Sequence, residues 1–460
     1  MVKLKSHQLL PVKFIQTHKG ILLFHSTGSG KTLTALFAMH QFNKPIIIIG
    51  PKSSRKAFTD NIKKANFDPS RFTFYSYKKV KNLVQTNLEI FSGKSVIVDE
   101  AHNLRNETTN NLFVISALGL AYKIILLTAT PVINYLNDFG VMVNIVKNED
   151  ALPTDRKLFS NMYYDEDNFA ITNEDILIKK LVDCISYYKT GEDNEHYPQH
   201  KTEEIEVEMS NEQLQEYVHY VNKIIFKGNM TSNDNPYDID FSTLDKKKKN
   251  FFLSGTRQLS NAVNGAISPK IEAIYKKIKE GPYPIIVYSN FLKNGIYPLA
   301  LLLEKNNITY KSITGDSTDD EVNMVVNNYN NGKYKVLLLS SAGSESLDLK
   351  GTRQIHIMEM WWNEPKITQT IGRAIRYKSH DALPKKDRNV TIYRWVSIFP
   401  KKILNQSVDQ YMVELSKKKH EIFNKFTEII KKVSIERTTK GGHLNEYARY
   451  KEMYLQLKNK

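Results

Sequence analysis

The sequence predicts an α/β protein with two doubly wound parallel-sheet lobes, a helical insertion between them and a helix near the C-terminus. Two observations predict this class. Short, continuously apolar runs alternate with longer mixed segments in two separate parts of the chain. A strand covered by helices on both faces needs such continuous hydrophobicity, and the alternation itself indicates βαβ units.

The first 150 residues carry the first set of alternating elements. The predicted strands are Ile21–Phe24, Ile46–Ile49, Phe72–Tyr75, Val96–Val98 and Ile124–Leu127. Leu33–Phe42 and Leu112–Leu120 are predicted helices between these strands. We therefore place the first lobe at residues 1–150.

The stretch 151–265 loses this alternation and is predicted to be a mostly helical insertion or linker. It holds 20 Asp and Glu against 13 Lys and Arg. An acidic stretch is a poor surface for a polyanion, so we do not expect it to be the main nucleic-acid contact.

Alternation returns in residues 266–405, which we take as the second lobe. Its predicted strands are Ile285–Tyr288, Val336–Leu339, Gln354–Ile357 and Val390–Tyr393. Residues 406–460 form a basic extension, in which apolar residues from Val408 to Val433 recur at helical spacing. Ser407 and Gln410 have the spacing of a capping box. We expect this helix to pack on the second lobe.

Composition narrows the class of protein. Lys and Arg number 65 against 49 Asp and Glu in 460 residues, a net charge of +16, which favours a polyanionic partner. No apolar run is long enough to span a membrane, and the N-terminus has no secretory signal. The single cysteine, Cys184, excludes an internal disulfide and favours a reducing compartment, where it is expected to be buried.

A phosphate-binding loop is predicted at residues 25–32, His-Ser-Thr-Gly-Ser-Gly-Lys-Thr, between a strand and a helix. Glycines allow backbone N–H groups to surround phosphate oxygens at a helix N-terminus. His25 stands where the usual first glycine would be. The residues expected to bind ATP are Thr27, Gly28, Ser29, Gly30, Lys31 and Thr32, with Thr32 also holding Mg²⁺.

Two acidic residues follow a predicted strand about seventy positions later. Asp99 ends the strand and is expected to reach the Mg²⁺ beside Lys31. Glu100 is placed to orient and deprotonate the attacking water. The loop alone would equally fit kinases, transporters or GTPases, so the remaining motifs decide the class.

Those motifs resemble, in order and spacing over residues 1–400, the superfamily 2 helicases. Asp99–His102 is the DEAH form of motif II, and Leu127–Pro131 is similar to motif III. Gln369–Arg376 resembles the Q-x-x-G-R-x-x-R pattern of motif VI. Three weaker resemblances are Pro51–Lys52 to motif Ia, Ile285–Phe291 to motif IV and Gly343–Asp348 to motif V, in which Ser346 replaces a common glycine.

Within that superfamily, two segments indicate a subgroup. Residues 354–369 are similar to Swi/Snf-type translocases. Arg376–Pro384 resembles the nucleoside triphosphatase I and early-transcription-factor ATPases of poxviruses and related large DNA viruses.

The resemblance implies two RecA-like lobes of a P-loop NTPase that hydrolyse ATP with Mg²⁺ between them. It implies that Gln8 senses adenine and that Gln369, Arg373 and Arg376 act in catalysis, the two arginines on the γ-phosphate. It assigns coupling of nucleotide state to track binding to His102, Thr128, Thr130 and Asp348. Pro51, Lys52 and Ser53 are expected to contact nucleic acid.

The expected track is DNA rather than RNA, held mainly through its phosphates. RNA polymerase or transcription factors are expected partners, and no membrane is. By analogy with the viral subgroup, the expected location is the cytoplasm, a viral factory or the virion, without secretion.

Three function classes stay open at this point. The first is a nucleic-acid motor, with or without strand separation. The second is an ATPase subunit of a transcription complex that acts mainly through protein partners. The third, a degenerate ATP-binding scaffold, is disfavoured because the motifs keep Lys31, Thr32, Asp99, Glu100, Arg373 and Arg376.

Overall fold

The computed structural model describes residues 3–105, 109–129, 135–165, 168–189, 196–239, 244, 246–341, 347–360 and 364–437. The chain divides into two compact units. Unit 1 comprises residues 1–191 and 418–460, and unit 2 comprises residues 192–417.

Unit 1 is built on a six-stranded parallel sheet with the strand order β3-β2-β4-β5-β1-β8. Its strands are β1 Gly20–His25, β2 Ile46–Gly50, β3 Phe72–Ser76, β4 Ser95–Asp99, β5 Lys123–Thr128 and β8 Ile185–Tyr188. Its helices are α1 Ser6–Thr17, α2 Lys31–His40, α3 Arg55–Lys64, α4 Tyr77–Thr86, α5 Thr109–Gly119, α6 Asn137–Lys147, α7 Arg156–Tyr163 and α8 Glu174–Leu181. A small hairpin pairs β6 Tyr164–Asp165 with β7 Ala170–Ile171.

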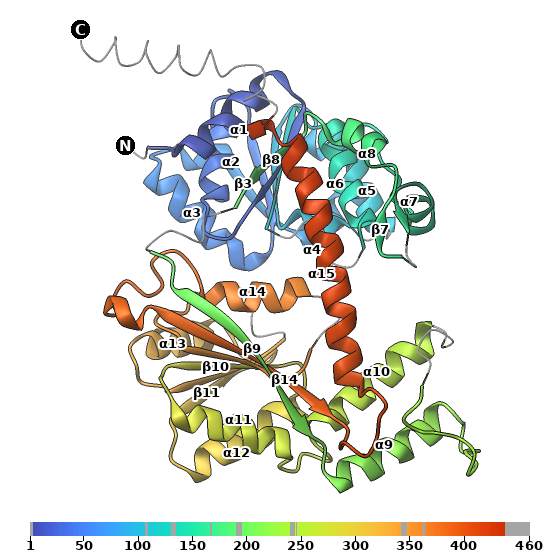
Figure 1. The fold of residues 1–460 in the computed structure, drawn as a ribbon. Helices are drawn as coiled ribbons and strands as arrows, with labels where there is room; N and C mark the ends of the chain where they lie inside the picture. The colour runs from blue at the N-terminus through green and yellow to red at the C-terminus, as the bar shows by residue number, and fades with distance from the viewer. Residues whose placement is uncertain are drawn as a thin grey trace. The chain divides into compact units, whose positions relative to one another are not determined.

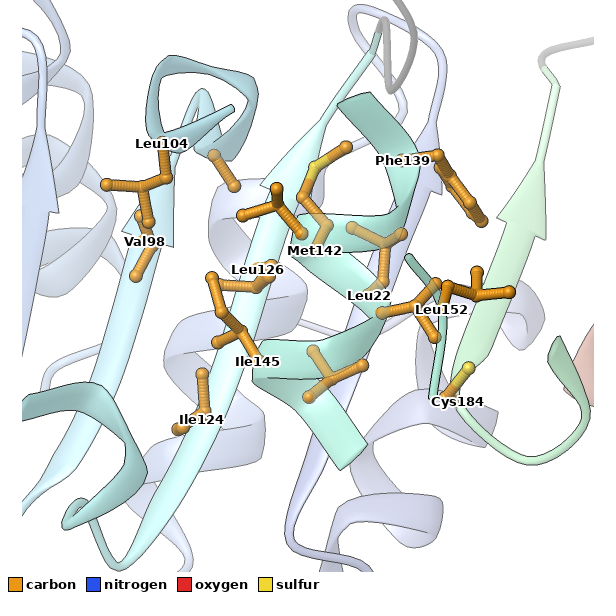
Figure 2. Close-up of a cluster of buried hydrophobic side chains, with 14 of the residues drawn as sticks. Leu22, Val98, Leu104, Ile124, Leu126, Phe139, Met142, Ile145, Leu152 and Cys184 are labelled. Carbon is orange, nitrogen blue, oxygen red and sulfur yellow. The ribbon is translucent and has the colours of Figure 1, made fainter. Parts of the chain in front are cut away.

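Apolar side chains fill both faces of this sheet, as a doubly wound fold requires. On one face, α6 buries Phe139, Met142 and Ile145 in the same cluster as Leu22 and Leu126 of the strands (Figure 2). On the other face, α2 packs with the alternate residues of β1 and β2. The strands are continuously apolar because both of their faces are covered.

Unit 2 contains a second six-stranded parallel sheet, with the order β11-β12-β10-β13-β14-β9 (Figure 1). Its strands are β9 Gln199–Glu208, β10 Ile285–Ser289, β11 Tyr310–Ile313, β12 Val336–Ser340, β13 Gln354–Ile357 and β14 Asn389–Ile398. Its helices are α9 Asn211–Ile224, α10 Lys246–Asn261, α11 Pro269–Glu280, α12 Tyr297–Lys305, α13 Asp319–Asn330 and α14 Glu364–Ala374.

The α/β class with two parallel-sheet lobes is thus confirmed, and all nine predicted strands are present. The division of residues 151–265 differs from the expectation. They form no separate helical insertion, because β8 is an edge strand of the first sheet and β9 is an edge strand of the second. An edge strand pairs with a neighbour on one side only and is less covered than an inner strand. Most positions of β9 are accordingly exposed and carry polar residues.

The predicted C-terminal helix is present as α15, Val408–Val433, drawn in red in Figure 1. The expected capping box forms: the Ser407 N–H donates to Gln410 Oε1 at 3.0 Å, and the Gln410 N–H donates to Ser407 Oγ at 3.2 Å. The expectation that the helix packs on the second lobe holds only for its first half. Its second half is buried in unit 1, where the Phe426 ring lies 5.2 Å from the Phe139 ring.

Candidate ATP site

The predicted phosphate-binding loop joins β1 to α2 in unit 1. Gly28 and Gly30 have left-handed φ angles of 75° and 88°, which suit glycine and turn the chain sharply into the helix. A Cβ on Gly30 would lie 2.5 Å from Gln8 Nε2, so a side chain there would displace the end of the Gln8 side chain. Ser29 is buried, and its hydroxyl has no hydrogen-bond partner among the described residues. The loop therefore keeps an unsatisfied polar group where phosphate is expected.

Lys31 is already held within the loop. Its Nζ donates to the backbone oxygens of His25, at 2.7 Å, and Ser26, at 3.1 Å. Thr32 follows it in the first turn of α2 and is half-buried, as is Thr27 in the loop. The ammonium group thus lies at the N-terminus of a helix, where it and the helix together favour an anion.

The predicted adenine-sensing residue, Gln8, lies on α1 beside the loop. Its Oε1 accepts the Lys5 N–H at 2.8 Å, and its Nε2 donates to Gly30 O at 3.2 Å. The neighbouring His7 hydrogen-bonds Ser29 O through Nε2 at 3.0 Å. Helix α1 is thereby tied to the phosphate loop through two side chains.

Asp99 ends β4, at the carboxyl edge of the sheet where ligands of such folds bind. Burial raises the pKa of Asp99 to about 6, and the charge of Glu100 adds to this rise. Lys31 and a hydrogen bond from the Ser54 hydroxyl act in the opposite direction and lower this pKa. A Cβ at Gly50 would lie 3.2 Å from Asp99 Cβ, so the end of β2 leaves room for the carboxyl group.

Glu100 has a left-handed backbone, with φ 51°. Such a conformation costs a non-glycine residue free energy and is found most often at functional sites. The Tyr77 hydroxyl lies 2.7 Å from Asp99 O and 2.9 Å from Glu100 O. This contact supports the strained backbone turn at Glu100.

His102 connects the acidic turn to the neighbouring strand. Its Nδ1 lies 3.1 Å from Thr128 Oγ1 at the end of β5 and 3.5 Å from Glu100 Oε2. Burial lowers the pKa of His102 to about 4, so the ring is neutral at physiological pH. Two predicted coupling residues are therefore in direct contact. Thr130, the third, lies outside the described residues.

The remaining predicted residues of this unit follow β2. Pro51 precedes a short 3₁₀ turn, Lys52–Ser54, in which Lys52 and Ser53 are exposed. The Ser54 N–H closes the turn by donating to Pro51 O at 3.0 Å. Because Ser54 also hydrogen-bonds Asp99, this exposed basic turn is linked directly to the candidate ATP site.

Unit 2 holds the motif VI residues on α14. Arg376, just after the helix, has Nη1 3.1 Å from Asp348 Oδ1. Arg373 is half-buried, and its backbone oxygen accepts the Leu349 N–H at 3.1 Å. The structure describes the backbone of Gln369 in α14 and not its side chain. Arg376 of motif VI is therefore in contact with Asp348 of motif V, while residues 343–346 of motif V lie outside the described residues.

Three contacts in unit 1 were missed by sequence reasoning. Ser54, Tyr77 and His7 each support the loop or the acidic turn by the bonds described above. Tyr77 was visible in the sequence only as an aromatic residue near a strand end. Its bonding partners lie 22 and 23 residues away, and no local pattern indicates them.

The side chains present fit ATP and a divalent cation. The loop offers backbone N–H groups, the unpartnered Ser29 hydroxyl and the Lys31 ammonium to phosphate. Mg²⁺ takes one or two protein oxygen ligands and completes its shell with phosphates and water. Thr32 and Asp99 offer those oxygens from α2 and β4.

Comparison with known proteins identifies the class to which this fold belongs. Residues 38–266 match the SNF2-related domain, and residues 269–378 match the helicase conserved C-terminal domain. The fold is similar to the helicase domain of Pyrococcus furiosus Hef, with a TM-score of 0.51 and 13% identity over 90% of this chain and 98% of that one. The chain is an ATPase of the helicase superfamily 2 type, with two RecA-like lobes.

Its sequence relatives define the group more closely. A protein of Acanthamoeba polyphaga mimivirus, provisionally named an ATP-dependent RNA helicase, is 56% identical over 94% of this chain and 98% of its own length. The termination factor NPH-I homolog of African swine fever virus (isolate Pig/Kenya/KEN-50/1950) is 26% identical over 91% of this chain and 76% of its own length. The chain therefore belongs to the SNF2-related helicase and NPH-I-like ATPase family of large DNA viruses. None of its described helices is long and apolar enough to cross a membrane.

Proposed function

We propose that this protein is an ATP-driven motor that moves along DNA during viral transcription or DNA handling. The observation that carries the proposal is the arrangement of Lys31, Asp99 and Glu100. A cation held at a helix N-terminus lies near enough to Asp99 to lower the pKa of its carboxyl group. The next residue along the chain, Glu100, is held in a strained turn.

In this proposal Thr32 and Asp99 hold Mg²⁺, which would neutralise charge on the phosphates. The loop N–H groups and Lys31 bind the phosphates, and Glu100 orients the attacking water and accepts its proton. Arg373 and Arg376 of unit 2 act on the γ-phosphate, and Gln369 supports them. Such arginines contribute about 10³–10⁵-fold in rate, so hydrolysis requires both units.

The proposed track is DNA, contacted mainly at its phosphates by Pro51, Lys52 and Ser53. Exposure of Lys52 and Ser53 supports this role. So does the bond between Ser54 and Asp99, because it gives a path from nucleotide state to the basic turn. His102, Thr128, Thr130 and Asp348 are proposed to relay that state. The match of residues 38–266 to the SNF2-related domain supports a nucleic-acid track, and the name of the mimivirus relative, an RNA helicase, makes RNA the competing track.

A second candidate function is an ATPase subunit that RNA polymerase or transcription factors activate, without strand separation. The name of the African swine fever virus relative, a termination factor homolog, favours a place in transcription for either function. We propose the viral factory or the virion as the location on the same ground.

The test is steady-state ATP hydrolysis by the full chain with no polymer, single-stranded DNA, double-stranded DNA or RNA. We expect double-stranded DNA to stimulate turnover most. Lys31→Ala should abolish turnover while the unfolding midpoint stays unchanged, and Lys56→Ala, an exposed lysine of α3, is the matched control. Normal turnover in Lys31→Ala would refute the site. Intact basal turnover that no polymer stimulates would favour the partner-activated subunit.

A further inference from the structure

The segment that follows α15 contacts β8, which pairs with β1, the strand that leads into the phosphate loop. Glu436 Oε2 accepts the Tyr187 N–H of β8 at 2.9 Å, and Glu436 Oε1 is hydrogen-bonded to Ser186 Oγ. Ser186 Oγ in turn lies 2.7 Å from Nε2 of His25, the first residue of the loop motif. A continuous hydrogen-bonded chain therefore joins the C-terminal segment to the candidate ATP site within unit 1.

His25 is fully buried, and its backbone is in contact with Lys31 of the phosphate loop. Its ring lies 5.9 Å from the Tyr188 ring and 6.1 Å from the His7 ring. Its backbone oxygen is the 2.7 Å acceptor of Lys31 Nζ. The residue whose ring ends this hydrogen-bonded chain is therefore the same residue whose carbonyl group holds Lys31.

With Glu436 ionised and the His25 ring neutral, the donors and acceptors assign the protons in this chain. Burial, with the nearby charge of Lys31, lowers the pKa of His25 to about 3, so its ring is neutral and carries one N–H. The Glu436 carboxylate accepts from Tyr187 and Ser186. Since Ser186 gives its only proton to Glu436, its oxygen must accept from His25 Nε2–H.

The other ring nitrogen agrees with this assignment. His25 Nδ1 is buried and has no hydrogen-bond partner among the described residues. This nitrogen is therefore the one without a proton, because a buried N–H without an acceptor would cost more free energy than an unbonded lone pair. Burial raises the pKa of Glu436 above its ordinary value, and its bonds to Ser186, Tyr187 and Ser434 oppose this rise without cancelling it.

We propose that Glu436 is a positioning residue for the phosphate loop: through Ser186 it selects the Nε2–H tautomer of His25 and so holds the His25 carbonyl against Lys31. This inference rests on the proposed ATPase function and adds a control of that site by the C-terminal segment. A carboxylate that merely anchored the segment would not need Ser186 or a particular His25 tautomer.

The decisive variant is Glu436→Gln in the full chain. Only the amide oxygen can accept the Tyr187 N–H, so the amide NH₂ must face Ser186 and donate to it. Ser186 then turns its proton to His25 Nε2, and the ring changes to the Nδ1–H tautomer. Long-range ¹H–¹⁵N NMR of the histidine rings reads this directly, with His25 assigned by a His25→Gln spectrum. We expect Nε2–H in the unaltered protein and Nδ1–H in Glu436→Gln.

Kinetics give the functional readout. We expect kcat/KM for ATP to fall about tenfold in Glu436→Gln, because the switched tautomer buries the His25 Nδ1–H without an acceptor and the ring must shift to relieve it. Ser186→Ala, which removes the link between Glu436 and His25, should fall by a similar factor. The double variant should fall no further, because Glu436 acts on His25 only through Ser186. The matched control is Glu428→Gln, an exposed glutamate of α15 that pairs with Lys431.

Several outcomes would overturn the inference. These are an Nδ1–H tautomer in the unaltered protein, an unchanged tautomer in Glu436→Gln, or normal kcat/KM in Ser186→Ala. Losses that simply add in the double variant would also count against it. Failure of the proposed function looks different, because the unaltered protein and Glu428→Gln would then hydrolyse no ATP. The His25 tautomer is measured without nucleotide. If Glu436→Gln does not fold, the tautomer is measured in Ser186→Ala instead, and that measurement still tests the hydrogen-bonded chain.

Discussion

Arg376 and Asp348 form an ion pair in which the guanidinium Nη1 lies 3.1 Å from the carboxylate Oδ1. The pair joins motif VI to motif V within unit 2. Because the Asp348 side chain is 57% exposed, the pair contributes little to stability. We expect the pair instead to hold the Arg376 guanidinium in one orientation.

Asp348→Asn should therefore lower kcat by about 3- to 10-fold with little change in KM, since a misdirected catalytic group costs rate. Arg376→Ala should lower kcat by about 10³-fold or more. Steady-state kinetics measure both. Asp387→Asn, which removes the partner of Arg353 at 3.3 Å in the same unit, is the control. Unchanged kcat in Asp348→Asn would show that the pair does not orient Arg376.

The contact of His102 with Thr128 should couple hydrolysis to the polymer. We expect His102→Ala and Thr128→Val to keep basal ATP turnover and to lose most of its stimulation by DNA, because the link between β4 and β5 is broken. The ratio of stimulated to basal kcat measures this. Thr86→Val, an exposed position at the end of α4, is the control. Equal loss of basal and stimulated turnover would assign the pair to the chemical step instead.

Lys270 and Asp409 form a buried ion pair at 2.7 Å, each side chain 1% exposed. Asp409→Ala leaves Lys270 charged and buried, so the free energy of unfolding should fall by about 3–5 kcal/mol. Urea denaturation measures it. Lys277→Ala, which removes an exposed pair with Glu280, should cost at most about 1 kcal/mol. If both variants lose the same amount, the buried pair has no special role in stability.

Cys184 should react with thiol reagents only after unfolding. Burial raises the pKa of Cys184 to about 12, and the thiolate is the reactive form. Alkylation at pH 8 should be about 10³-fold or more slower in the folded protein than in urea, where the thiol regains its ordinary pKa. Mass spectrometry counts the modified chains. Rapid alkylation of the native protein would mean that the α8–β8 turn opens readily.

The fold was predictable wherever burial left a simple pattern. Eight of the nine predicted strands are inner strands of their sheets, and their continuous apolar runs record this. The ninth, β3, is an edge strand that was recognisable from its aromatic run, Phe72–Tyr75. The other edge strands, β8, β9 and β11, were missed: β8 and β11 have four residues each, and β9 places glutamates at Glu203, Glu204, Glu206 and Glu208. The interpretation of residues 151–265 as an insertion failed for the same reason.

The candidate site, like the fold, could be predicted from the sequence only in part. Motif spacing predicted the residues that would meet ATP, because a loop and a strand end are local features. Their supports were not predictable, since Tyr77, Ser54 and Ser186 reach the site only through strand order. Ser186 lies 161 residues from His25 and is adjacent to it because β8 pairs with β1.

The two halves of α15 bear on the order in which the chain can fold during synthesis. Ile422, Phe426 and Ile430 complete the core of unit 1, most of which lies in the first 191 residues. A ribosome must therefore make all of unit 2 before that core can close. Until then the emerging N-terminal lobe exposes apolar surface, so a chaperone that binds nascent chains should engage this protein early and release it late.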